Sequence, residues 1–139
     1  MNMKKIYLII CLSLLYSPFK TLAQSSNDKN QILQQCVSLE QLNEKITKKT
    51  TKYYVLNHGI DFSNSLNLEV KGKKISILEK SDLNISRSYF LFHTLNIDGN
   101  TAFVRYYYTY TIDNLEKVIP ITLSFQKKES KWEIVNCSI

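Results

Sequence analysis

Apolar residues recur every three or four positions between Asn30 and Thr50, a stretch that has neither glycine nor proline. The positions on this stripe are Ile32, Cys36, Leu39, Leu42 and Ile46, and lysine and glutamate fill the other faces. This spacing predicts an amphipathic helix with one face toward a core. Ser38 and Gln41 are spaced as in a capping box, which leaves open a break into two helices near Val37.

The flanks of this stripe carry weaker patterns. Gln24–Lys29 is polar, and we expect it to be disordered. Lys48–Tyr54 combines threonines with lysines and favours helix less. Asn57-His58-Gly59 is typical of a helix C-terminus, so we expect the helical part of the chain to end there.

From Leu66 onward the period of the pattern changes from helical to two. Leu66, Leu68 and Val70 alternate with polar residues, and Ile75 and Ile77 do the same after Lys71-Gly72-Lys73. This predicts a hairpin between Leu66 and Lys80 with an exposed, lysine-rich edge. The polar stretch Ser81–Arg87 then predicts a connection.

The clearest pattern is in Ser88–Ile139, where turn signals separate strand-like runs. Asp98-Gly99 is a favoured two-residue hairpin turn, Asp113-Asn114 is a second candidate, and Lys127–Ser130 is a third. These turns predict strands over 88–97, 100–112 and 115–126, followed by a last strand. The fold class is therefore α+β, with an N-terminal helical segment packed on a curved antiparallel sheet.

The turn assignments also predict which side chains share a face. The pairs are His93/Val104, Leu91/Tyr106 and Tyr89/Tyr108 in one hairpin, Val104/Leu123 and Tyr106/Ile121 in the next, and Trp132/Phe125 and Ile134/Leu123 in the last. A slip of one residue in either of the first two turns would destroy their agreement. The predicted core face comprises Tyr89, Leu91, His93, Leu95, Ala102, Val104, Tyr106, Tyr108, Ile119, Ile121, Leu123, Phe125, Trp132 and Ile134.

The opposite face is too aromatic for a purely solvated surface. It carries Phe90, Phe92, Phe103, Arg105, Tyr107, Thr109, Val118, Pro120, Thr122 and Ser124. Either a second element covers this face or it is an interaction surface, for which Phe90, Phe92, Phe103, Arg105 and Tyr107 are the candidates. Pro120 removes a ladder donor and indicates a strand edge, a bulge or a bend.

Residues 1–23 have the pattern of a signal peptide. Lys4 and Lys5 precede the apolar run Ile6–Tyr16, and Thr21-Leu22-Ala23 offers a cleavage site before Gln24. An uncleaved N-terminal anchor is the alternative. With cleavage, residues 24–139 form a single α+β domain that is secreted or periplasmic and is not an integral membrane protein.

Cleavage also changes the charge. It removes three lysines and no acid, so the formal net charge falls from +6 to +3, which argues against nucleic acid as a partner. Two lysine clusters remain, at Lys45, Lys48, Lys49 and Lys52 and at Lys71, Lys73 and Lys74. They provide solubility or bind an acidic envelope component.

Two cysteines follow the signal peptide, Cys36 and Cys137. Export permits a disulfide between them, which we predict, and two separate buried thiols are the alternative. Strict alternation from Trp132 points Cys137 away from the helix, so the bridge would need either a bulge or twist between Ile134 and Cys137 or a helix N-terminus that wraps past the sheet edge. The chain has no zinc-ligand spacing, so no metal is expected.

The C-terminal half resembles nuclear-transport-factor-2-like domains. The resemblance rests on Asn96–Val104, which contains a DG-x-A-x-V hairpin, on Ile121–Phe125, and on Lys131–Val135 with its x-W-x-I form. It implies a cone in which helices lie in the concavity of a curved sheet. The hairpin at Leu66–Lys80 suits a cystatin-like arrangement equally.

The predicted inner face has tyrosines and a histidine but no acid, so the general base that enzymes of the cone family use is missing and no catalytic residue is assigned. The pocket candidates are Tyr89, His93, Tyr106, Tyr108 and Tyr110. Our preferred function is an exported, non-enzymatic binding or protein-interaction module of the cell envelope, without a cofactor. A ligand-binding or catalytic cone is the alternative, and filling of the inner face by Ile32, Leu39, Leu42 and Ile46 would argue against it.

Overall fold

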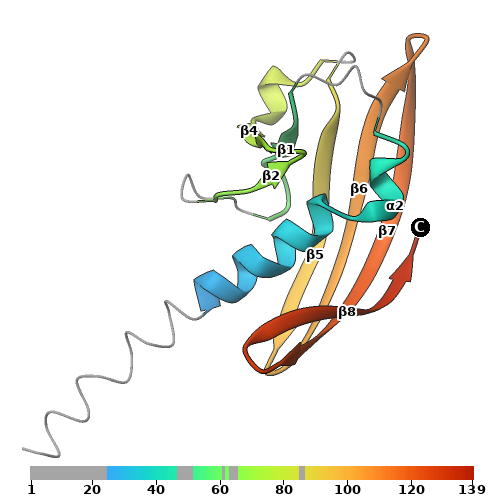
Figure 1. Cartoon of the computed structure of the whole chain (residues 1–139). Helices are drawn as coiled ribbons and strands as arrows, with labels where there is room; N and C mark the ends of the chain where they lie inside the picture. The colour runs from blue at the N-terminus through green and yellow to red at the C-terminus, as the bar shows by residue number, and fades with distance from the viewer. Residues whose placement is uncertain (1–24, 47–51, 61, 63–65, 85–86) are drawn as a thin grey trace, which may run out of the picture.

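The computed structural model describes residues 25–46, 52–60, 62, 66–84 and 87–139 (Figure 1). It has an α+β fold, as predicted, in which helices pack on a curved sheet of six strands in the order β4-β1-β5-β6-β7-β8. The sheet is mixed, because β1 is parallel to both of its neighbours, so the prediction of a purely antiparallel sheet is wrong. The predicted signal peptide, its cleavage site and residues 47–51 lie outside the described residues.

The helical stripe is confirmed, with the break near Val37. Residues 25–37 form a helix, and α2 (Glu40–Asn43) adds one turn after Ser38 and Leu39. All five stripe residues, Ile32, Cys36, Leu39, Leu42 and Ile46, are at most 6% exposed. The capping box is wrong, since Leu39 is the N-cap of α2 and the Ser38 hydroxyl accepts a hydrogen bond from Gln34 Nε2 at 2.6 Å. Residues 25–29 are helical rather than disordered.

The predicted helix end at Asn57-His58-Gly59 is wrong. β1 (Tyr54–Leu56) lies between β4 (Ser76–Leu78) and β5 (Tyr89–Asp98) and pairs with both in parallel. Aromatic and β-branched residues favour strand, and a parallel strand inside a sheet lacks the alternation by which strands are recognised. Val55 of this strand is fully buried in the main core.

The predicted Leu66–Lys80 hairpin is confirmed only around its turn. β2 (Glu69–Val70) and β3 (Lys73–Lys74) pair across Lys71-Gly72, whose φ angles are +51° and +74°. Positive φ at both central residues is the requirement of a type I′ turn. Ile77 lies instead on β4, where it pairs with Val55. A 3₁₀ turn, η1 (Lys80–Asp82), follows.

The register between β6 (Thr101–Ile112) and β7 (Leu115–Lys128) is confirmed. The observed pairs include Val104↔Leu123, Tyr106↔Ile121 and Tyr108↔Ile119. The loop is Asp113-Asn114, with φ of +51° and +61°. A two-residue turn with a strong left-handed preference therefore fixed this hairpin correctly.

The predicted register of β5 is wrong, for two reasons. The loop is Gly99-Asn100 and not Asp98-Gly99, because Asp98 pairs with Thr101. A β-bulge then lies between Phe92 and Thr94. One extra residue in a strand reverses the direction of every side chain beyond it.

The bulge places Phe90 and Phe92 on the core face, opposite Tyr108 and Tyr106, and both phenylalanines are fully buried. Leu91 and Tyr89 face the other way, and His93 is exposed. Burying two phenylalanines in place of a leucine and an imidazole removes more apolar area from water and keeps the polar ring hydrated. Phe90 and Phe92 are therefore core residues and not interaction-face residues.

A second bulge lies in the pairing of β7 with β8 (Lys131–Ser138). The loop is Glu129-Ser130, so Trp132 pairs with Lys127 rather than with Phe125. Phe125 pairs with Ile134 and Ser124 with Asn136, which leaves Val135 as the extra residue. Cys137 consequently pairs with Leu123 and faces inward, as the required bulge or twist implied.

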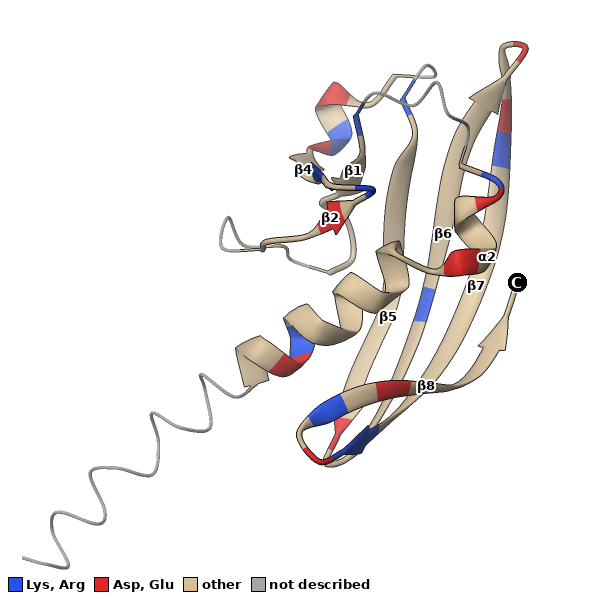
Figure 2. Ribbon diagram, viewed as in Figure 1, with Lys and Arg blue, Asp and Glu red and all other residues tan. Residues whose placement is uncertain are grey.

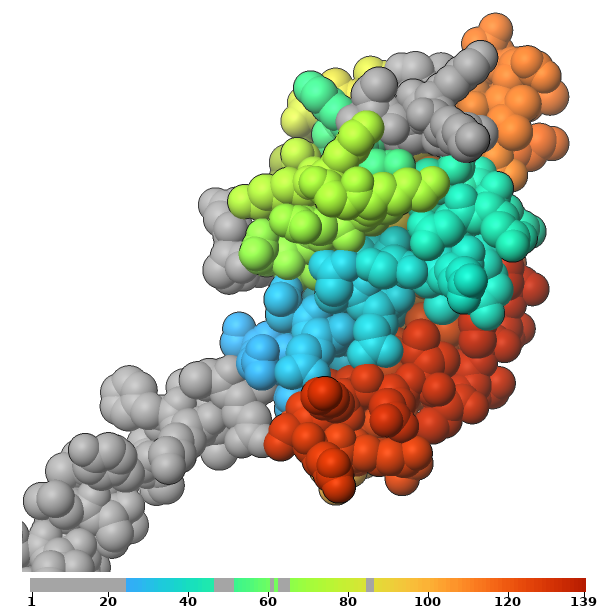
Figure 3. Space-filling view, viewed as in Figure 1, coloured from blue at the N-terminus to red at the C-terminus, as the bar shows by residue number. Residues whose placement is uncertain are grey.

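The main core lies between the sheet and the helices. Helix 25–37 and α2 cover one face of the sheet, which curves around them (Figures 1 and 3). A smaller cluster on the opposite face comprises Leu56, Leu78 and Tyr89, with Tyr54, Leu83 and Leu91 packed against it. Among the described residues this cluster covers the β4-β1-β5 end, together with Thr109 of β6, and leaves exposed side chains such as Phe103, Val118 and Val135 on the outer face of β6, β7 and β8.

Leu123→Ala is expected to lower the free energy of unfolding by about 2–5 kcal/mol, because truncating a fully buried leucine loses contacts and leaves a cavity. Leu115→Ala is the matched control on the same strand, since its side chain is 61% exposed and its loss should cost less than about 0.5 kcal/mol. Urea unfolding followed by circular dichroism measures both. A loss below about 1 kcal/mol at Leu123 would contradict the observed face assignment.

Candidate interaction face

Three of the five pocket candidates lie together on the inner face, where they form packed core. Tyr106 is fully buried, and its hydroxyl donates a hydrogen bond to the Cys36 carbonyl oxygen at 2.6 Å. Its ring stacks on Phe92 at 4.9 Å, and Tyr108 stacks on Tyr110 at 5.7 Å between ring centroids. Burial raises the pKa of Tyr106, so this phenol is a structural donor.

The other two pocket candidates lie elsewhere. Tyr89 belongs to the small cluster on the opposite face. His93 is exposed at the bulge, with Nδ1 2.9 Å from the Thr94 hydroxyl. The structure therefore does not assemble the predicted Tyr/His-lined pocket, and the bulge that the sequence did not reveal is the reason.

The inner face is filled by the helices. Ile32, Leu39, Leu42 and Ile46 are all at most 6% exposed and pack in the same cluster as Tyr106, Tyr108 and Trp132. A filled inner face argues against a ligand-binding cone. The space that a ligand would need at these positions is taken by side chains.

Cys36 and Cys137 are free thiols, so the predicted disulfide is wrong. Cys36 is buried in the core, and burial raises the pKa of its thiol. Cys137 is half-buried and packs against the same core. Both cysteines pack as small apolar side chains, which is the alternative that the sequence left open.

Three of the five interaction-face candidates do lie on the open outer face. Phe103 is 37% exposed, Arg105 is exposed and Tyr107 is half-buried. The Arg105 guanidinium carbon lies 5.9 Å from the centroid of the Phe103 ring, within the range of a cation–π interaction. Phe103 and Arg105 therefore present a joint apolar and cationic surface.

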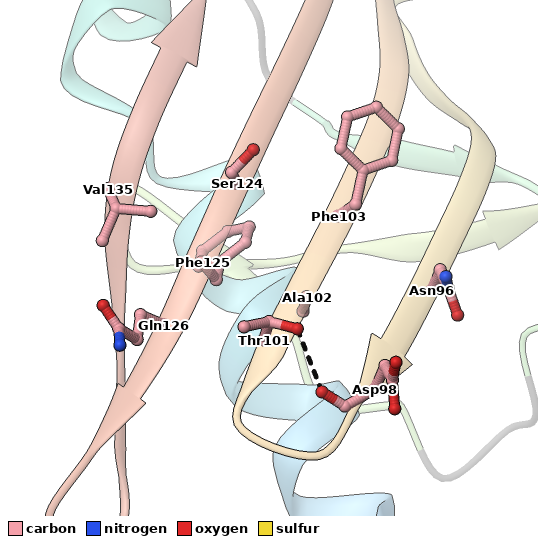
Figure 4. A pocket seen from close by; sticks show the side chains of 9 residues that line it. All are labelled: Asn96, Asp98, Thr101, Ala102, Phe103, Ser124, Phe125, Gln126 and Val135. Carbon is pink, nitrogen blue, oxygen red and sulfur yellow. Dashed lines mark hydrogen bonds between the residues drawn. The ribbon is translucent and has the colours of Figure 1, made fainter.

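A groove of about 460 Å³ crosses this face (Figure 4). We call it the outer groove, and its lining comprises Asn96, Asp98, Thr101, Ala102, Phe103, Ser124, Phe125, Gln126 and Val135. These residues come from four adjacent strands, β5 to β8. The Thr101 hydroxyl donates a hydrogen bond to the Asp98 carbonyl oxygen at 3.0 Å, which braces the turn at one end of the groove.

The outer groove offers apolar contact and hydrogen bonding. Phe103 and Val135 (55% exposed) supply the apolar surface. Asn96, Gln126, Ser124 and Thr101 supply amide and hydroxyl groups, and Asp98 is the charged residue of the lining. The amide, hydroxyl and apolar groups of this lining are suited to binding.

Of the residues that line this groove, Phe103 and Ser124 are predicted from the sequence to lie on the outer face. Asn96, Thr101, Gln126 and Val135 are not. Thr101 and Gln126 lie two residues from Phe103 and Ser124 along the same strands, so extending the alternation would have found them. Val135 could not be found in this way, because it is the extra residue of the second bulge.

The described lysines of the two clusters are exposed, namely Lys45, Lys52, Lys71, Lys73 and Lys74. Lys48 and Lys49 lie outside the described residues. The Lys71 ammonium also lies 3.4 Å from the carbonyl oxygens of Asn43 and Ile46, where it satisfies the C-terminal end of α2. This contact gives one of the clustered lysines a structural role.

Within the described part of the chain, no three His, Cys, Asp or Glu side chains gather closely enough to hold a metal ion. Over the same residues, no helix has the length and apolar character needed to span a bilayer. Comparison of the chain with protein-family models, curated proteins and solved structures gave no match.

An ion pair joins the start of helix 25–37 to the β7–β8 hairpin. Lys127 Nζ lies 2.8 Å and 3.0 Å from the two Asp28 carboxylate oxygens, and the side chains are only 12% and 13% exposed. The same ammonium lies 5.6 Å from the Trp132 ring centroid. Burial opposes ionisation of Asp28, but its contacts with Lys127 and Trp132 together outweigh that effect and lower the pKa of the carboxyl below its ordinary 3.8.

Asp28→Asn is expected to lower the free energy of unfolding by about 1 kcal/mol at pH 7. Because the folded-state pKa of Asp28 is lowered, its stabilisation is present above the ordinary value of 3.8 and is lost as the pH falls below it. The gap between the two proteins should therefore close in acid. Glu133→Gln, which breaks the half-exposed 3.0 Å pair with Lys128, is the control and should cost less than about 0.5 kcal/mol. Urea unfolding between neutral and acid pH measures this, and a gap that persists in acid would contradict it.

Proposed function

We propose that this chain is an exported, non-enzymatic protein-interaction module of the cell envelope that binds a partner through its outer groove. The observation that carries the proposal is the contrast between the two faces of the sheet. The inner face is filled by helix residues, whereas the outer face presents a groove of about 460 Å³ edged by exposed Phe103 and Val135.

The chemistry of the outer groove supports a protein partner. Aromatic and arginine side chains are enriched among residues that dominate binding energy at protein interfaces, and Phe103 with Arg105 combines the two. Neutral amides and hydroxyls around them match the hydrogen-bonding groups of a polypeptide. A volume of about 460 Å³ is enough to seat one or more side chains of the partner.

The alternative, a small-ligand or catalytic cone, has weaker support. It would use the inner tyrosines, but the Tyr106 hydroxyl donates its hydrogen bond to the Cys36 carbonyl oxygen, and His93 is exposed at the bulge in β5. As part of our proposal about the fold, we keep the resemblance to nuclear-transport-factor-2-like or cystatin-like domains. The helices covering one face of a curved sheet support it.

Export is the remaining part of the proposal, and it rests on residues 1–23. Lys4 and Lys5 before an apolar run, with Thr21-Leu22-Ala23 at its end, support a cleaved signal peptide. An exported module would meet partners in the envelope, either another protein or an acidic component. The outer groove favours a protein over an acidic polymer, because its charged lining residue is Asp98.

Photo-crosslinking tests the proposed face. The full chain, carrying benzoylphenylalanine in place of Phe103, is expected to yield a discrete adduct with one partner protein when irradiated in the cells that produce it. The same group in place of Lys74, an exposed residue of β3, is the control and should yield no such adduct. Adding Arg105→Ala to the first variant should reduce the adduct, because the cation beside the probe is lost.

Circular dichroism must show that each crosslinking variant is folded. No adduct at position 103, or the same set of adducts at positions 103 and 74, would contradict the proposed interaction face.

A further inference from the structure

β8 is the last strand in the order of the sheet, and among the described residues its backbone pairs only with β7. The outward side of such a strand presents amide and carbonyl groups without ladder partners. Near its start this side is covered, because Gln35 Nε2 donates a hydrogen bond to the Trp132 carbonyl oxygen at 2.6 Å. Within the described part of the chain, the open part of the edge is therefore Glu133–Ser138.

A depression of about 390 Å³ lies beside this open edge, between β8 and the helices. We call it the edge pocket, and its lining comprises Gln35, Ser38, Leu39, Glu40, Gln41, Ile134 and Cys137. Leu39, Ile134 and Cys137 supply apolar surface, and the other residues are polar. Val135, on the other side of the same strand, lines the outer groove.

A strand added to β8 would meet both depressions. Successive side chains of a strand point to opposite faces of the sheet, so alternate residues of the added strand would lie beside the edge pocket on one face and beside Val135, at the rim of the outer groove, on the other. Backbone pairing then gives affinity, and the depressions select side chains, as in other cases of β-strand addition. β8 therefore combines an open ladder with a recognition surface on each of its faces.

The charge of the depressions indicates which side chains they favour. Among the described residues, the charged residue that lines the edge pocket is Glu40 on α2 (Figure 2), whereas Asp98 of the outer groove lies on β5, three strands away from β8. The Glu40 carboxylate favours basic residues on the side of the added strand that faces the edge pocket, and Val135 favours apolar residues on its other side.

We propose that the open edge of β8 is the docking site for an extended segment of the partner protein, in which apolar and basic residues alternate and which adds to the sheet as a further strand. This inference rests on the proposed binding function and specifies the chemistry of the partner. The partner's remaining surface would then lie over the outer groove, which begins at Val135.

The other edges of the sheet fit such a segment less well. β4 is only three residues long. β7 extends beyond β8 from Leu115 to Ile121, but that part contains Pro120, which has no N–H to contribute to a ladder. A second copy of this chain is also a poorer occupant, because β8 has no basic residue after Lys131 to place near Glu40.

A synthetic peptide series tests the inference on the full chain. The probe is a fluorescein-labelled peptide of alternating lysine and valine, eight residues long to match β8, with blocked ends. Fluorescence anisotropy should show saturable binding. An analogue with glutamate in place of lysine, and an analogue N-methylated on alternate amides so that it cannot pair with β8, should each bind at least about tenfold more weakly.

Glu40→Lys should weaken binding of the lysine–valine peptide by about tenfold. Glu44→Lys is the matched control, since this exposed glutamate lies one turn further along and does not line the edge pocket, and it should leave binding nearly unchanged. Equal weakening by the two variants, or binding that is insensitive to N-methylation, would overturn the inference in favour of general charge attraction.

Amide hydrogen exchange separates this inference from the proposed function. Bound peptide should slow exchange in Glu133–Ser138. A crosslinked partner at position 103 without peptide protection of β8 would overturn strand addition and leave the proposed function standing. Protection of β8 by the peptide without any adduct at position 103 would overturn the proposed outer-groove interaction and leave strand addition standing. Slowed exchange in β8 that depends on protein concentration alone would identify a second copy as the occupant and overturn the choice of partner.

Discussion

A single extra residue in β5 decides which aromatic side chains the sheet buries. Because His93 bulges out of the ladder, Phe90 and Phe92 turn inward and pack against Tyr108 and Tyr106, with ring centroids 4.9 Å apart in each pair. Each buried phenylalanine contributes about 1.5–3 kcal/mol relative to an exposed one. This arrangement and the helices together fill the concavity of the sheet. Phe90 and Phe92 consequently do not lie on its outer face.

The second bulge has the matching effect at the edge of the sheet. The extra residue, Val135, lines the outer groove, and Cys137 turns inward beside Ile134 to line the edge pocket. Bulges commonly protect an edge strand by twisting it, and Gln35 covers one carbonyl of β8 in addition. The bulge at Val135 therefore limits non-specific pairing with β8 and also shapes the two depressions. The depressions would make pairing with β8 selective.

Local signals predicted the parts of the fold that depend on local structure. The spacing of Ile32, Leu39 and Leu42 identified the buried helix face, and Asp113-Asn114 fixed the β6–β7 register. Asp98-Gly99 was less decisive, because Gly99-Asn100 can form the loop equally well. β1 was not predicted, because its partner strands lie more than 20 residues away along the chain. The bulges were not predicted, because the alternation of apolar and polar residues does not indicate where a bulge lies.

The residues of the candidate site were likewise predicted correctly only where local structure fixes their position. Phe103, Arg105 and Tyr107 were placed correctly, since they lie on β6, whose register the turn fixed. Phe90, Phe92 and His93 were placed on the wrong faces, since they lie at or beyond the bulge. Glu40 and Gln35 of the edge pocket depend on how the helices meet β8, a contact between segments that are about 100 residues apart.

The filled inner face is the claim on which the functional account depends, and thiol labelling of the native protein tests it most directly. Modification by iodoacetamide without reductant, read at each cysteine by peptide mass mapping, should reach half-buried Cys137 and spare Cys36 until the protein is unfolded. In denaturant both should react. Labelling of Cys36 as fast as Cys137 in the native protein would contradict the filled concavity, and failure of both to react even in denaturant would show that they are joined in a disulfide.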